Sequence, residues 1–144
     1  MMGQLYCWDI REGTLLVKGQ ESVETTYEIS PVFLDEERVL YVTEDSIVCA
    51  DSSNLDRRYT IPDMKVIALA VSPDLTRFAV AQNSYQVAVY DAADGSLIAC
   101  YEDEGQAETI GWNLTFSEDG KRLLFEGAYG DGSAYRIIRE DDAA

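Results

Sequence analysis

The stretch Val87-Ala88-Val89-Tyr90-Asp91 decides the fold, because two similar stretches occur earlier in the chain. Ile47-Val48-Cys49-Ala50-Asp51 and Leu5-Tyr6-Cys7-Trp8-Asp9 have the same pattern, a run of strand-forming residues that ends in aspartate. The three aspartates are 42 and 40 residues apart. A nearly constant period of about 40 residues indicates an internal structural repeat.

A second set of copies supports the same period. Residues 71–80 align without gaps on residues 116–125, and residues 33–41 align on both when one residue of the turn is omitted. Each repeat therefore contains a first strand, an acidic tight turn, a second strand, a third strand that ends in aspartate, and an outer strand. Many short strands at even spacing predict an all-β antiparallel protein.

This repeat resembles the WD-repeat β-propeller family. Residues 116–124, Phe-Ser-Glu-Asp-Gly-Lys-Arg-Leu-Leu, are similar to the family's hairpin between first and second strands, and Trp8-Asp9 is similar to its signature dipeptide. The dipeptide is degraded to Ala50-Asp51 and Tyr90-Asp91, and Tyr135-Arg136-Ile137 replaces it in the last copy. Because the chain has no histidine, the family's Asp-His network cannot form, so the resemblance is to a divergent member held by apolar packing.

The resemblance implies four-stranded blades, of which this chain holds a little over three as one partial propeller unit. We expect a half blade at 1–20, blades at 25–62 and 64–102, an incomplete blade at 110–138 and an acidic tail at 139–144. Propellers close with typically 4 to 8 blades. The chain is therefore expected to be part of a longer propeller chain or to form a homodimer, whose roughly 26 strands would match six or seven blades.

Composition excludes several classes of function. The chain has 27 Asp and Glu against 11 Lys and Arg, and its charge of −16 disfavours binding to nucleic acid or to a membrane surface. The absence of histidine excludes Ser-His-Asp and Cys-His nucleophiles and His-ligated metals. We therefore expect no catalytic residue, cofactor or metal. Without a targeting pattern, and with three widely spaced cysteines, the sequence predicts a cytoplasmic location.

The repeated aspartates have a structural interpretation. Asp9, Asp51 and Asp91 recur at one position of the repeat, as a turn residue would, whereas a binding site would need only one copy. We expect each carboxylate to accept backbone N–H groups of the following turn. The position two residues earlier is cysteine in the first two copies and valine in the third, which predicts a small apolar core position.

Aromatic side chains near strand ends are the candidates for protein binding. We select Tyr41, Tyr85, Tyr129 and Trp112, because propellers bind through loops on their faces and because Tyr and Trp dominate interface energetics. Acidic clusters such as Asp35-Glu36-Glu37 favour a basic protein partner, although solvated turns also explain them.

The sequence therefore predicts a non-enzymatic scaffold for protein–protein interaction. Two alternatives stay open. One is a sensor or regulatory module of a larger signalling protein. The other is a propeller hydrolase that works with carboxylates alone, which two carboxylates converging in one pocket, one of them with a strongly raised pKa, would reveal.

Overall fold

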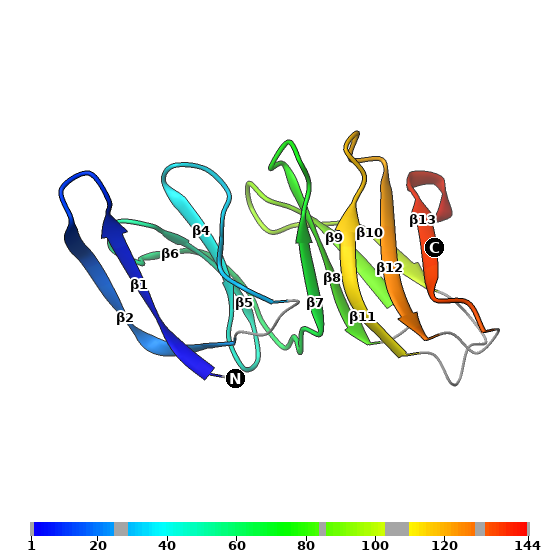
Figure 1. Cartoon of the computed structure of the whole chain (residues 1–144), viewed down its shortest axis with the longest axis horizontal. Coiled ribbons are helices and arrows are strands. Elements are labelled where there is room, and N and C mark those ends of the chain that lie inside the picture. The colour runs from blue at the N-terminus through cyan, green and yellow to red at the C-terminus, as the bar shows by residue number, and fades with distance from the viewer. Residues whose placement is uncertain (1, 25–28, 84–85, 103–109, 129–131, 144) are drawn as a thin grey trace. The chain divides into compact units, whose positions relative to one another are not determined.

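The fold is built almost entirely from antiparallel strands (Figure 1). The computed structural model describes residues 2–24, 29–83, 86–102, 110–128 and 132–143. The chain divides into two compact units, unit 1 (residues 1–65) and unit 2 (residues 66–144). None of the described residues belongs to a helix with the length and apolar character needed to span a membrane.

Unit 1 contains a two-stranded sheet followed by a four-stranded sheet. The first sheet pairs β1 (Met2–Asp9) with β2 (Thr14–Glu24), which extends beyond the expected end at residue 20. The second sheet has the order β3-β4-β5-β6, made of β3 (Val32–Phe33), β4 (Arg38–Val42), β5 (Ile47–Asp51) and β6 (Arg57–Ile61).

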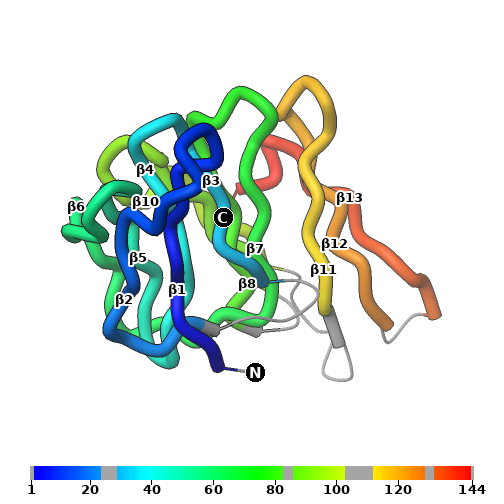
Figure 2. Tube along the Cα trace, turned by 60° about the vertical axis from the view of Figure 1, so that its left-hand side comes forward, coloured from blue at the N-terminus to red at the C-terminus, as the bar shows by residue number. Residues whose placement is uncertain are grey.

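Unit 2 contains a four-stranded sheet followed by a three-stranded sheet. The four-stranded sheet has the order β10-β9-β8-β7, made of β7 (Ala68–Val71), β8 (Arg77–Asn83), β9 (Gln86–Asp91) and β10 (Leu97–Glu102). In the last sheet β11 (Ile110–Phe116), β12 (Arg122–Ala128) and β13 (Tyr135–Arg139) lie side by side in that order (Figure 2). A single 3-10 turn, η1 (Glu140–Asp142), follows β13.

Strand pairing in the two four-stranded sheets follows the repeat. Arg38 at the start of β4 is paired with Asp51 at the end of β5, and Arg77 of β8 is paired in the same way with Asp91 of β9. Opposite charges directly across an antiparallel pair are favourable. Asp51 and Asp91 therefore end the third strand of the two four-stranded sheets, as the sequence predicts.

The last sheet departs from this pattern. Arg122 of β12 is paired with Arg139 of β13, so Arg139 takes the position of the repeated aspartate. The expectation that Tyr135-Arg136-Ile137 replaces the signature dipeptide is therefore wrong, because the ladder gives that place to Ile138 and Arg139. Two equal charges across a strand pair are unfavourable unless other groups compensate them.

The hairpins after the three aspartates share one left-handed residue. Gly13, Leu55 and Gly95 have φ of 68°, 60° and 77°. Each donates its backbone N–H to the carbonyl of the aspartate four residues earlier, at 2.7 or 2.8 Å. Glycine adopts this conformation freely, but a residue with a Cβ is disfavoured there. The side chain of Leu55 packs on the core of unit 1, which offsets this unfavourable conformation. It also approaches Gly19 so closely that a side chain at position 19 would have its Cβ 3.2 Å from Leu55 Cδ1.

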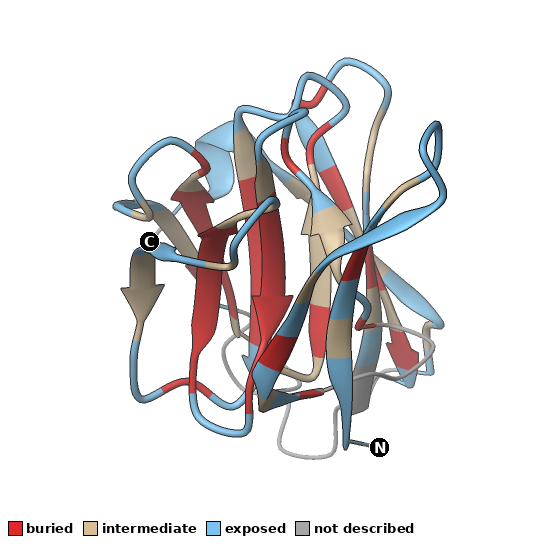
Figure 3. Ribbon diagram, turned by 90° about the vertical axis from the view of Figure 1, so that its left-hand side faces the viewer, coloured by how far each residue is buried: buried red, intermediate tan, exposed pale blue. Residues whose placement is uncertain are grey.

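In each unit the two sheets pack on each other through an apolar cluster, and Figure 3 shows buried residues along the strands and exposed residues in the turns. The cluster of unit 1 consists of Val23, Val39, Tyr41, Val48 and Ala50. The cluster of unit 2 consists of Ala68, Ala79, Ala81, Val87, Val89, Tyr101, Leu114, Leu123 and Phe125. Burial of these side chains is the main favourable contribution to folding.

The turn between β7 and β8 is held by Asp74. Its Oδ1 accepts hydrogen bonds from the Ser72 hydroxyl at 2.7 Å and from the Thr76 hydroxyl at 2.7 Å and backbone N–H at 3.1 Å. The Ser72 hydroxyl, followed by the Thr76 groups, lowers the pKa of Asp74 to about 2. The charged form is thus favoured by folding, and it contributes stability at pH above about 4 that is lost as the pH falls towards 2.

We expect Asp74→Asn to lower the melting temperature at pH 7, because the amide accepts these hydrogen bonds less strongly than the carboxylate. The difference from the wild type should shrink as the pH falls from about 4 to about 2, where the wild-type carboxyl becomes protonated. Thermal unfolding at several pH values measures both effects. Glu118→Gln, which removes one charge from the corresponding turn of the last sheet, is the control; a pH-independent deficit for Asp74→Asn would contradict the prediction.

Candidate functional site

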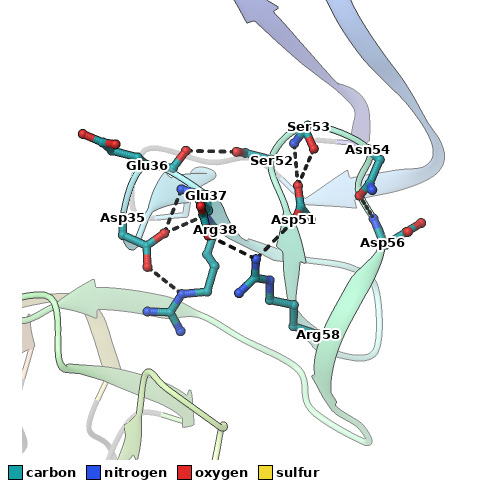
Figure 4. A network of polar contacts seen from close by, with 10 residues as sticks. All are labelled: Asp35, Glu36, Glu37, Arg38, Asp51, Ser52, Ser53, Asn54, Asp56 and Arg58. Carbon is teal, nitrogen blue, oxygen red and sulfur yellow. Dashed lines mark hydrogen bonds and ion pairs between the residues drawn. The ribbon is translucent and has the colours of Figure 1, made fainter.

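The most charged loop region of unit 1 is formed by the turns at residues 34–37 and 52–56, which we call the acidic rim (Figure 4). In the first turn Asp35 Oδ1 accepts the backbone N–H groups of Glu37 and Arg38, each at 2.8 Å. Its Oδ2 accepts Arg38 Nε at 2.8 Å. The Arg38 guanidinium, followed by the Glu37 N–H, lowers the pKa of Asp35, so this carboxylate stays charged and fixed.

Asp51 has the same role in the second turn. Its Oδ1 accepts the Ser53 hydroxyl at 2.6 Å and the Ser53 N–H at 2.9 Å, and its Oδ2 accepts Arg58 Nη2 at 3.2 Å. The Ser53 groups, with Arg58, lower the pKa of Asp51. The other repeated aspartates also bond to their turns: Asp9 accepts N–H groups at 2.9 and 3.0 Å, and Asp91 accepts one at 2.8 Å.

The remaining carboxylates of the acidic rim face solvent. The side chain of Glu37 is 79% exposed, 3.7 Å from Arg58 Nη2, and Glu36 and Asp56 are also exposed. The two turns are joined by the Ser52 hydroxyl, which donates to the Glu36 carbonyl at 3.2 Å. The acidic rim thus combines a fixed backbone with outward-facing negative charge, which attracts cationic groups.

Unit 1 also has a polar pocket of about 530 Å³. Glu21 is one of its charged lining residues; its Oε2 is 2.6 Å from Arg57 Nη2, and its Oε1 accepts the Tyr41 hydroxyl at 2.5 Å. Burial, followed by the hydrogen bond to Glu21, raises the pKa of Tyr41, which therefore remains a donor. The pocket is lined by Met2, Glu21, Ser22, Thr43, Glu44, Asp45, Ser46, Arg57, Thr60, Pro62 and Asp63.

The structure places the predicted binding aromatics in different environments. Trp112 is 45% exposed on β11, so it is accessible to a partner. Tyr41 is only 2% exposed, so the expectation that it lies on the surface is wrong. Its strand β4 is an inner strand of its sheet, and its ring belongs to the core of unit 1. Tyr85 and Tyr129 lie outside the described residues.

The predicted cysteine positions are buried. Cys7 and Cys49 are 8% and 0% exposed, and Val89 at the corresponding position of the third copy is 4% exposed. Burial raises the pKa of both thiols. This small apolar position is confirmed in all three sheets that carry it.

Sequence reasoning did not find the link between Glu21 and Arg57. The two residues are 36 positions apart and belong to different strands of unit 1, and neither stands in a recognisable motif. Tyr6 also lies near a strand end, but exposed Trp8 of β1 is not among the aromatics that the sequence indicates for binding, although a comparison of the copies would show it. The corresponding positions of the second copy, Val48 and Ala50, are residues typical of a buried strand.

The described residues contain no group of three or more Cys, Asp or Glu side chains that could hold a metal ion. Five described carboxyl groups have a clearly displaced pKa, and in every case hydrogen bonds within a turn lower it; they are Asp35, Asp51, Asp74, Asp94 and Asp119. A general acid needs the opposite shift. Nothing in this part of the chain favours the hydrolase alternative.

Comparison with solved structures shows the fold. The crystal structure of the C-terminal WD40 domain of Sif2 matches 93% of this chain with a TM-score of 0.64 and 15% sequence identity. The chain spans 45% of the length of that domain. No family model matches the sequence, and no curated protein matches it. The prediction of an all-β, partial WD-like propeller is thereby confirmed at the level of the fold.

Proposed function

We propose that this protein is a non-enzymatic scaffold that binds a basic protein partner through the acidic rim of unit 1. The observation that carries the proposal is that some carboxylates of this region are held by hydrogen bonds while others are exposed. Asp35 of the rim and Asp51 next to it are held by hydrogen bonds within the turns, whereas Glu36 and Glu37 are exposed, with Glu37 3.7 Å from Arg58 Nη2. A preorganised acidic surface binds cationic side chains with a small loss of conformational entropy.

The WD40-like fold supports this proposal by analogy only, because a fold does not determine a function. A net charge of −16 adds long-range attraction for a basic partner and repulsion for nucleic acid. Exposed Trp112, together with Tyr85 and Tyr129, is proposed to add aromatic contacts elsewhere on the scaffold. We propose a cytoplasmic location for this activity.

We also propose that the chain is a divergent member of the WD-repeat family whose ring is completed by other strands. A second copy of the chain, or the rest of a longer propeller chain, would supply them. The chain spans 45% of the matched WD40 domain, which supports completion by a similar amount of structure. The expected blades at 25–62 and 64–102 remain part of this proposal, together with a half blade that extends to residue 24 and an incomplete blade that extends to residue 139.

The test is titration with a synthetic lysine-rich peptide at low and physiological ionic strength. We expect the double variant Glu36→Lys, Glu37→Lys to weaken binding about tenfold, because two rim charges are reversed. The control is Glu118→Lys, Asp141→Lys, which changes the net charge equally at exposed positions of unit 2. Added salt should weaken wild-type binding. Equal weakening by both double variants would show only general charge attraction and would contradict the proposed site.

A further inference from the structure

Neighbouring sheets within each unit meet through the same pair of faces. In unit 1 Leu5 of the first sheet packs on the cluster that contains Val39 of the second sheet. In unit 2 the residue that corresponds to Leu5 is Val87, four positions before its aspartate, and it clusters with Leu123, which corresponds to Val39. One type of sheet-to-sheet contact therefore occurs twice in this chain.

The last sheet of unit 2 leaves uncovered the face that corresponds to the Leu5 and Val87 side of the earlier sheets, the side that packs on the following sheet within a unit. We call it the C-terminal face; its members are Leu124 and Glu126 of β12, paired with Ile137 and Tyr135 of β13. Tyr135 is 54% exposed and Ile137 is 46% exposed. In the preceding sheet of unit 2, each corresponding residue is at most 4% exposed and covered by the next sheet; these residues are Ala79, Ala81, Val87 and Val89.

The first sheet of unit 1 leaves uncovered the face that corresponds to the Val39 and Leu123 side of the later sheets, the side that packs on the preceding sheet within a unit. We call it the N-terminal face; its members are Tyr6 and Trp8 of β1, paired with Lys18 and Leu15 of β2. Tyr6 is 46% exposed and Trp8 is 58% exposed, whereas the corresponding residues of the second sheet, Val48 and Ala50, are fully buried in the core of unit 1. Lys18 Nζ lies 5.6 Å from the centroid of the Tyr6 ring, a cation–π contact at the margin of this face.

We propose that the C-terminal face of one copy of this chain packs on the N-terminal face of a second copy, and that the reverse contact closes the pair. The contact would be a third instance of the sheet-to-sheet contact found in both units. This inference rests on the ring completion proposed above and commits to a second copy as the occupant. Two copies together are about nine-tenths as long as the matched WD40 domain, since one copy spans 45% of it.

The number of sheets agrees with closure. The described residues of one chain form four sheets, so two chains supply eight. Only four of these eight sheets are four-stranded, so the 26 strands of two chains equal six or seven complete blades, within the range of 4 to 8 in which propellers close. Two identical contacts related by a two-fold axis close the assembly, whereas a head-to-tail contact that does not close would give a filament.

Charges at one end of the two faces are complementary. Within unit 2 Arg77 Nη1 lies 3.4 Å from Oε1 of Glu140, the first residue of η1 after the last strand of the neighbouring sheet. Arg122 occupies the position of Arg77 in the last sheet. Across the proposed contact Arg122 meets the end of β1 and the turn after it in the second copy, which carry Asp9, Arg11 and Glu12. Two chains of charge −16 also repel each other at long range, so added salt should strengthen the pair.

The test uses sedimentation equilibrium of the full chain at several protein and salt concentrations. We expect twice the chain mass of 16.1 kDa for the wild type. Ile137→Arg and Trp8→Glu should each raise the dimer dissociation constant at least about tenfold, because each places a charge in both contacts. The control is Leu97→Arg, at a 60% exposed position of β10 that belongs to neither face, and it should leave the constant within about twofold.

Mixing the two variants tests which face meets which. A pair made of one Ile137→Arg chain and one Trp8→Glu chain has one contact with both substitutions, where the charges are opposite, and one wild-type contact. The mixture should therefore dimerise more strongly than either variant alone. Circular dichroism checks that each variant is folded.

Each outcome is decisive. A wild-type monomer overturns both this inference and completion by a second copy. A dimer that neither variant weakens, or that mixing does not restore, overturns the assigned faces but leaves self-association standing. A mass that rises without limit overturns the closed pair. Unchanged binding of the lysine-rich peptide in a monomeric variant shows that the acidic rim functions independently of the contact.

Discussion

Replacing Phe125 with alanine is expected to lower the free energy of unfolding of unit 2 by about 3–5 kcal/mol. Phe125 is 2% exposed, is paired with Leu114 of β11, and belongs to the cluster between the two sheets of unit 2. Alanine removes the whole ring from this cluster and leaves a cavity that a sheet held by ladders on both sides fills poorly. Phe116→Ala should lower the free energy of unfolding by less, because Phe116 packs at the margin of the same cluster and is only half-buried.

Urea unfolding measures this loss in unit 2. The chain has two tryptophans, Trp8 in unit 1 and Trp112 in unit 2, so a Trp8→Phe background makes Trp112 the fluorescent reporter. Protein concentration is held constant, because association also stabilises the folded chain. Leu97→Ala, at a 60% exposed position of the same unit, should change stability by no more than about 0.5 kcal/mol. A loss below about 1 kcal/mol for Phe125→Ala would contradict the described core.

Cys49 is expected to react with a maleimide on the order of 10³-fold more slowly in the folded chain than in urea. The thiol is completely buried in β5, and burial raises its pKa, so reaction requires local or global opening. An opening free energy of about 5 kcal/mol, at the low end for a folded domain, corresponds to several thousandfold protection. Cys49 should therefore be the most protected of the three cysteines.

The other two cysteines provide the comparison. Cys100 is half-buried on β10 and should react first. Cys7 is 8% exposed in the two-stranded sheet and should react at an intermediate rate. Peptide mass spectrometry after short labelling times gives the order. If Cys7 and Cys49 reacted as fast as in urea, the alignment of the third strands would be wrong.

Most of the fold was predictable because the repeat fixes which strand follows which. The aspartates at one position and the arginine at the start of each second strand are paired across the sheets, as with Arg38 and Asp51. The last copy was misaligned because its aspartate is replaced by Arg139, which removed the residue on which the alignment depended. The backbone pairing of β12 with β13 still sets the register of the last sheet, although Arg139 in place of the aspartate no longer indicates it in the sequence.

The candidate site was less predictable, because it depends on packing between sheets. Tyr41 lies near the end of its strand in the sequence, yet the first sheet of unit 1 covers its ring. The ion pair of Glu21 with Arg57 forms only when β2 is next to the second sheet. The acidic cluster at 35–37 was visible in the sequence, but only the hydrogen bonds distinguish the fixed Asp35 from the outward-facing Glu36.

The left-handed Leu55 has a consequence for how unit 1 folds. A two-stranded sheet such as β1–β2 is at best marginally stable alone in water. Leu55 belongs to the hairpin of the next sheet, and its side chain reaches Gly19 in β2. Part of the packing that offsets its unfavourable backbone conformation, the contact with β2, is available only when both sheets are in place. We therefore expect the hairpin turn and the first sheet to form cooperatively, so that unit 1 unfolds as a whole rather than by fraying from its first strand.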